Sequence, residues 1–175
     1  LAIVQNLLAG GLDPNSCYTL PRRPGPPSRR DFCLVEDAAH SGNPAVVAAL
    51  IERGLNARQV SGARALIVAA AAGNLPIVQL LTQAGASVQH VENGRTALSA
   101  AVDRTQEDPA AAAVVDWLDA RGALEFDPAD KLTAAERRLF TAARRGDMAV
   151  LRSALDAGAK ATVVAHESSP QTRAS

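Results

Sequence analysis

A short hydrophobic phrase recurs along the chain and predicts a series of similar helices. In each copy, Val or Leu is followed three residues later by Leu or Ala and, four residues after that, by Gly. Apolar residues at i and i+3 lie on one face of a helix, and the Gly supplies the left-handed stop after the last turn. The five copies are Val4-Leu7-Gly11, Val47-Leu50-Gly54, Val78-Leu81-Gly85, Val115-Leu118-Gly122 and the weaker Leu151-Ala154-Gly158.

A second phrase, an apolar residue followed three residues later by a small or apolar pair, precedes each of the last four copies. It begins at Val35, Leu66, Leu98 and Leu139, and three of these copies run into a turn signal of Gly followed by Asn or Asp. Each unit therefore reads as helix, tight turn, helix and Gly stop. Units of this kind, spaced by roughly 30 to 45 residues, predict a repeat protein.

The best copy resembles the ankyrin-repeat family. Residues 62–87, GARALIVAAAAGNLPIVQLLTQAGAS, are similar to the family phrase G-x-T-P-L-H-x-A-A-x-x-G-x-x-x-x-V-x-x-L-L-x-x-G-A. The resemblance covers residues 1–161 and implies an all-α solenoid of stacked helix-turn-helix units. TPR and HEAT repeats need longer helices, and the bulky aromatic positions of TPR do not fit a chain with 3% aromatic residues.

The repeat boundaries define one expected domain, residues 1–161. It comprises a half-repeat at 1–12, a Pro/Arg-rich loop insertion at 13–31, and repeats at about 32–58, 62–91, 94–126 and 132–161; a flexible tail is expected at 165–175. The half-repeat has only a second helix, which predicts a further piece before Leu1. No copy keeps the full T-P-L-H phrase, and loss of its His removes hydrogen bonds between neighbouring turns, so we expect an irregular stack. Extra residues around Thr105 enlarge the turn of the fourth unit.

Composition and charge narrow the class of partner. The hydrophobic content of 47% is that of a globular protein, and 18 Lys and Arg against 18 Asp and Glu give zero net charge. A neutral chain has no overall electrostatic attraction to nucleic acid or to an anionic membrane. No apolar run approaches the ~20 residues that a membrane span needs. We expect a protein partner, no nucleic acid and no membrane span, and either a monomer or a heteromeric complex.

The chain carries no recognisable catalytic motif. G-x-S-x-G, H-E-x-x-H, P-loop and G-x-G-x-x-G phrases do not occur, and His40, His90 and His166 lie in three separate settings without ligand spacing. We therefore predict no enzyme, no cofactor and no metal site.

Cys17 and Cys33 flank the Pro/Arg-rich loop, and a disulfide between them would staple it. The alternative is two unpaired thiols. A disulfide would indicate a periplasmic or secreted protein, because such bonds persist in oxidising compartments, whereas free thiols would indicate the cytoplasm.

The residues between the repeat phrases are the predicted partner-binding residues, because the phrases themselves fix only buried positions. In the loops between units these are Arg58, Gln59, Arg64, Gln89, His90, Glu92, Asn93 and Arg95, and Glu36, Ser99 and Asp103 are expected to border the same groove. A basic cluster in the insertion adds Arg22, Arg23, Arg29 and Arg30, which would pair with an acidic patch on a partner.

Two functions follow from this interpretation. The first is a dedicated binder of one protein, for instance a bacterial immunity or inhibitor protein that blocks a toxin. The second is a targeting or scaffold module cut from a larger effector or regulatory protein.

Overall fold

The computed structural model describes residues 2–19, 31–125, 134–156 and 158. The chain divides into two compact units, residues 1–130 and 131–175, and each is described by itself.

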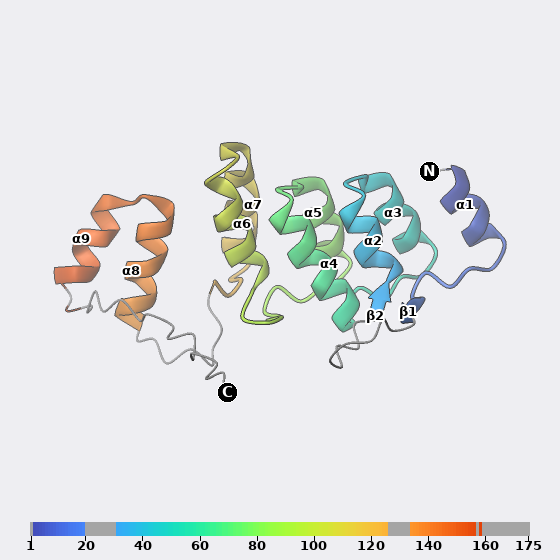
Figure 1. Cartoon of the computed structure of the whole chain (residues 1–175), viewed down its shortest axis with the longest axis horizontal. Coiled ribbons are helices and arrows are strands. Elements are labelled where there is room, and N and C mark those ends of the chain that lie inside the picture. The colour runs from blue at the N-terminus through green and yellow to red at the C-terminus, as the bar shows by residue number, and fades with distance from the viewer. Residues whose placement is uncertain (1, 20–30, 126–133, 157, 159–175) are drawn as a thin grey trace, which may run out of the picture. The chain divides into compact units, whose positions relative to one another are not determined.

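Unit 1 is a succession of short helices with one small hairpin of strands near its start (Figure 1). Helix α1 is followed by two antiparallel strands and then by three pairs of helices. The elements are α1 (Ala2–Ala9), β1 (Cys17–Thr19), β2 (Asp31–Cys33), α2 (Leu34–His40), α3 (Pro44–Glu52), α4 (Val60–Ala71), α5 (Leu75–Gln83), α6 (Ala97–Thr105), the 3-10 turn η1 (Pro109–Ala111) and α7 (Ala112–Asp119).

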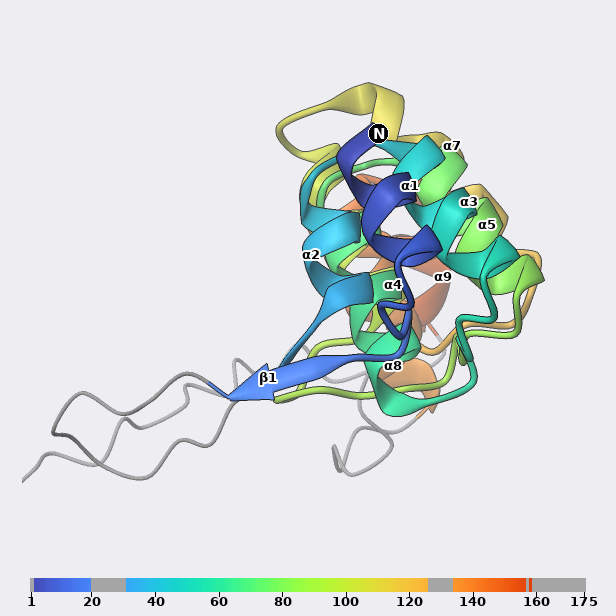
Figure 2. The ribbon, with the colours of Figure 1, turned by 90° about the vertical axis from the view of Figure 1, so that its right-hand side faces the viewer.

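The helices of unit 1 form two layers (Figure 2). The first helix of each pair packs on the next one along the stack, so that α2 contacts α4 and α4 contacts α6. The second helices do the same, with α1, α3, α5 and α7 in sequence. This arrangement confirms the all-α repeat solenoid that the sequence predicts.

Local sequence explains where the second helices begin and end. Asn43 and Asn74 cap α3 and α5, each followed by a Pro in the first turn, where its missing N–H costs nothing. Each predicted stop glycine has a positive φ, the conformation that L-residues other than Gly avoid. The φ values are 94° at Gly11, 94° at Gly54, 98° at Gly85, 66° at Gly122 and 86° at Gly158.

The core is a chain of thin apolar layers rather than one large centre. The repeated anchors are fully or nearly fully buried, and Ala fills the space where first helices pack on each other. Burying one Leu contributes about 1.5–3 kcal/mol, so the stack depends on many equal contributions. The buried anchors include Val47, Leu50, Leu66, Val78, Leu81, Leu98, Val115 and Leu118.

Side-chain hydrogen bonds connect successive repeats within unit 1. The Asn74 amide donates to the Gly42 carbonyl at 2.9 Å, which links the α5 cap to the preceding turn. The fourth residue after Gly11 and the fourth after Gly85 each reach the stop glycine of the next repeat. Asn15 donates to the Gly54 carbonyl at 3.2 Å and Gln89 donates to the Gly122 carbonyl.

Arg58 holds the corresponding position between these two ties. A Cβ built on Gly85 would lie 3.1 Å from both Cγ and Nε of Arg58, so the arginine stem covers that glycine. The sequence lacks the His of the T-P-L-H phrase, and we expected this to remove hydrogen bonds between neighbouring turns. The contacts of Asn15, Arg58 and Gln89 link neighbouring turns in another way. In the α6 unit, Thr96 and Ser99 instead form a buried reciprocal cap, with two bonds of 3.0 Å.

The first turn of α4 contains Gly62, the first residue of the matched family phrase. The helix begins at Val60. The family's Pro position is occupied by Ala65, so no proline limits the helix at that point. Gly62 is required there because a Cβ would lie 2.1 Å from the Ala57 carbonyl oxygen.

The insertion predicted at 13–31 contains β1, and β2 begins at its last residue, Asp31; the sequence pattern did not indicate either strand. Cys17 pairs with Cys33 and Tyr18 with Phe32 across the β1–β2 ladder, and β2 leads directly into α2. The sulfur atoms of Cys17 and Cys33 lie 2.00 Å apart, at bonding distance, in agreement with the predicted pair. Figure 2 shows β1 directed away from the helices.

Unit 2 contains one helical hairpin, α8 (Ala134–Arg145) and α9 (Met148–Asp156). Leu139 and Ala154 are buried between them, with Leu151 packed alongside. The predicted repeat at 132–161 thus contains the expected helix, turn and helix. The expected flexible tail, 165–175, lies outside the described residues.

The Asn caps give a test of the inter-unit bond. Asn43→Ala removes a helix cap alone, which costs about 1 kcal/mol of unfolding free energy. Asn74→Ala removes a similar cap and also the bond to Gly42, so we expect it to cost about 1 kcal/mol more. Urea denaturation of the two variants measures the difference, and equal losses would contradict the proposed contribution of the inter-unit bond.

The cysteine pair gives a second test. Thiol titration of the unreduced protein in denaturant should find no reactive thiol, and prior reduction should release both. Two free thiols before reduction would show that the pair is not bonded in the purified protein.

Candidate functional site

A groove of about 650 Å³ lies on unit 1 between α2, α4 and the turn that precedes α6. Helix α4 contributes its floor, Phe32 and α2 form one wall, and the turn forms the other. The described lining residues are Phe32, Glu36, Asp37, His40, Arg64, Ile67, Val68, Ala71, Ala72, Glu92, Asn93 and Arg95.

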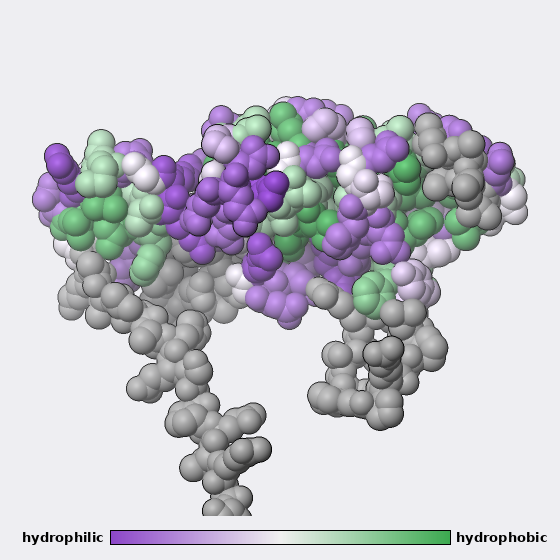
Figure 3. Space-filling view, turned by 45° about the horizontal axis from the view of Figure 1, so that its top comes forward, coloured by the Kyte–Doolittle hydropathy of each residue, from purple (hydrophilic) through white to green (hydrophobic). Residues whose placement is uncertain are grey.

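The floor of the groove is apolar and only half-buried. Ile67, Val68 and Ala71 pack against the core with one side and face the groove with the other. Figure 3 shows hydrophobic residues exposed among hydrophilic ones over unit 1. Half-exposed aliphatic side chains in a concavity are typical of sites that bind apolar groups of a partner.

The α2 wall carries an aromatic pair and a carboxylate. The rings of Tyr18 and Phe32 stack with centroids 5.7 Å apart. The Tyr18 hydroxyl donates to Oδ2 of Asp37 at 3.2 Å, and this bond to a carboxylate raises the pKa of the phenol. His40, the last residue of α2, bonds through Nδ1 to the Glu36 carbonyl oxygen at 3.1 Å. The hairpin and α2 therefore form one connected wall.

The opposite wall is a tight two-residue turn. Glu92 and Arg95 exchange backbone hydrogen bonds of 2.9 and 3.0 Å, and the two residues between them both have positive φ. These are Asn93 at 51° and Gly94 at 75°, the Asn-Gly combination that favours a type I′ turn. The turn fixes where the Glu92 and Arg95 side chains leave the backbone.

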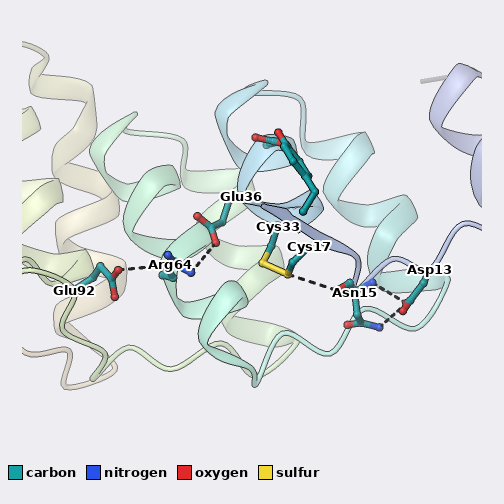
Figure 4. Close-up of a disulfide and its surroundings, with 9 residues drawn as sticks. Asp13, Asn15, Cys17, Cys33, Glu36, Arg64 and Glu92 are labelled. Carbon is teal, nitrogen blue, oxygen red and sulfur yellow. Dashed lines mark hydrogen bonds and ion pairs between the residues drawn. A yellow bond between two sulfur atoms is a disulfide. The ribbon is translucent and has the colours of Figure 1, made fainter. Parts of the chain in front are cut away.

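Arg64 connects the two walls (Figure 4). Its guanidinium lies 3.5 Å from Oε1 of Glu36 on α2 and 3.4 Å from Oε1 of Glu92 on the turn. The Arg64 side chain is only 17% exposed, and Glu36 is 12% exposed. His90 lies behind the turn, with Nε2 3.3 Å from the other Glu92 oxygen. Arg64 is the shared cation of this partly buried network, so its loss would leave two carboxylates without the guanidinium that they contact.

The outer rim has a weaker ion pair. Arg95 lies 3.7 Å from Asp103 of α6, and the two side chains are 55% and 47% exposed. Exposed pairs contribute little to stability, so Arg95 is free to exchange Asp103 for a partner group.

The predicted binding residues fall into three groups. Arg64, Glu92, Asn93 and Arg95 line the groove together with Glu36, and Asp103 contacts it through Arg95. The second group does not line the groove. Arg58 and Gln89 contact the next repeat, and His90 contacts Glu92. Gln59 precedes α4, and Ser99 is buried in the cap of α6. Arg22, Arg23, Arg29 and Arg30 lie outside the described residues.

Several lining residues were missed by the sequence reasoning. Phe32, Asp37, His40, Ile67, Val68, Ala71 and Ala72 were not among the candidates. A signal existed for two of them. Ile67 stands where the family phrase has its His, and Val68 stands at the next position, which the phrase leaves open. A large aliphatic side chain at either first-helix position indicates a contact surface.

Within residues 2–19, 31–125, 134–156 and 158, no group of three His, Cys, Asp or Glu side chains could hold a metal ion. The helices of those same ranges include none that is both long and apolar enough to cross a bilayer.

Comparison with known protein families identifies ankyrin repeats, in three copies, with matches over residues 1–92 and 34–120. No curated protein matches the chain. The two family matches together extend over well more than half of the 175 residues and include every element that forms the groove. The chain therefore belongs to the ankyrin-repeat family, whose repeats are modules of protein–protein interaction.

Proposed function

We propose that the groove between α2, α4 and the 92–95 turn binds one specific protein partner. The observation that carries this proposal is the half-exposed apolar floor held between two walls that Arg64 links. Apolar surface supplies binding free energy, and polar groups at the rim supply orientation.

Preorganisation supports the same site. The wall residues are already fixed by the Arg64 contacts and by the backbone bonds of the turn. A partner that docks there pays little ordering entropy, which raises affinity for a given contact area.

The finer form of the proposal is an inhibitor role, in which the groove covers a functional surface of one toxin-like protein. The rigid site and the cysteine-paired hairpin beside it support a dedicated binder. The alternative is a targeting or scaffold module, for which the partner stays active in the complex. Activity of the captured partner, assayed with increasing amounts of this protein, separates the two.

A matched pair of substitutions tests the groove. Ala72 and Ala120 are both exposed helix C-caps with αR backbone, but only Ala72 lines the groove. Ala72→Trp places an indole in the binding space and should reduce partner capture at least tenfold, whereas Ala120→Trp should leave it unchanged. The measurement is quantitative pull-down from cells of the source organism.

Melting temperatures of both variants control for folding. Equal capture by Ala72→Trp and Ala120→Trp would place the partner on another surface and refute the groove as the site.

A further inference from the structure

We propose that the groove selects a basic–apolar segment of its partner, in which a Lys or Arg side chain lies against Tyr18, Phe32 and Asp37 while an adjacent apolar side chain contacts the α4 floor. This inference rests on the proposed function of the groove and specifies the chemistry of its ligand.

The charge of the described lining favours a cation. Three carboxylates, Glu36, Asp37 and Glu92, face the groove together with the guanidinium groups of Arg64 and Arg95. Arg64 is held between two of those carboxylates, at 3.5 and 3.4 Å, and Arg95 lies beside a fourth carboxylate, Asp103. Neither arginine is therefore an unopposed positive charge. An acidic segment or a phosphate would have to compete with carboxylates that are already in place.

Asp37 is the group best placed to receive the cation. It is exposed, and the contact it makes with Tyr18 is to a neutral hydroxyl, at 3.2 Å. That hydrogen bond orients the carboxylate without neutralising its charge. A Lys or Arg head group that reached Asp37 would gain a charge-assisted hydrogen bond in a partly enclosed position.

The aromatic pair beside Asp37 suits the stem of the same side chain. Tyr18 is 49% exposed and stacks on Phe32, which lines the groove. Long basic side chains place their methylene groups along apolar surface while the head stays with a charged partner. An aromatic face also attracts the cation directly. Aromatic rings next to a carboxylate thus fit both parts of Lys or Arg.

The α4 floor accounts for the apolar part of the segment. Ile67, Val68 and Ala71 are half-buried and present aliphatic surface. A partner residue next to the basic one along an extended or helical segment can reach this floor while the cation remains at Asp37. A purely charged segment would leave the floor uncovered.

Selection from a displayed library of short random peptides tests this assignment without knowledge of the natural partner. The full-length protein, its Asp37→Asn variant and the control Asp116→Asn are each panned under identical conditions. Asp116 is exposed on α7, outside the groove, and Asp37→Asn preserves an acceptor for the Tyr18 hydroxyl. We expect wild type and Asp116→Asn to enrich Lys or Arg beside apolar residues relative to the unselected library.

The strongest peptide is then synthesised and its Kd measured by fluorescence polarisation. Asp37→Asn should raise Kd by about threefold to tenfold, and added salt should raise Kd for wild type more than for that variant. Asp116→Asn should have no effect, and Ala72→Trp should abolish binding.

The outcomes distinguish the two levels of the proposal. Enriched peptides that are acidic or uncharged, but that Ala72→Trp blocks, would refute the basic–apolar assignment and leave the groove as a binding site. Peptides that Ala72→Trp does not affect, or the absence of any enrichment, would refute the groove itself.

Discussion

The stack of unit 1 exists because none of its helical pairs can bury its own apolar face alone. Leu66 and Leu98 are 0% and 2% exposed because adjacent units cover them, and the Ala residues of the first helices let those helices approach closely. Much of the free energy of folding therefore comes from the interfaces between repeats and not from contacts within a single repeat. A hydrogen bond between two repeats, such as that from Asn74 to Gly42, therefore helps to fix the position of one whole repeat relative to the next.

This sharing explains how the groove is positioned. Its walls come from successive parts of the stack: Glu36 lies on α2, Arg64 on α4 and Glu92 on the turn before α6. The three side chains meet only because the first helices pack at a fixed spacing. At that spacing Arg64 contacts both walls, so its side chain holds the site together and also forms part of its surface. Arg95 and Asp37 are more exposed and remain available for contact.

The sequence predicted the parts of the fold that follow local or periodic rules. Stop glycines such as Gly85 and anchors such as Leu81 repeat with the helices, and both could be placed without a structure. The groove was predicted only in part, because its contacts join residues from different units. Arg58 and Gln89 are exposed polar loop residues, as binding residues are, yet their side chains extend along the stack to the next stop glycine. The local sequence pattern does not distinguish a polar side chain that binds a partner from one that connects two repeats.

The hairpin before α2 is where this chain adds most to the repeat scaffold. Strand β2 continues into α2 without a loop, and Cys33 occupies the N-cap position of that helix while its sulfur lies at bonding distance from Cys17. The Tyr18 bond to Asp37 fastens the other strand to the same helix. These connections place an exposed aromatic ring and a carboxylate together at one wall of the groove. Because the floor and the opposite wall derive from the repeat units themselves, the hairpin wall is the part of the site that can acquire a new specificity without altering the buried stack.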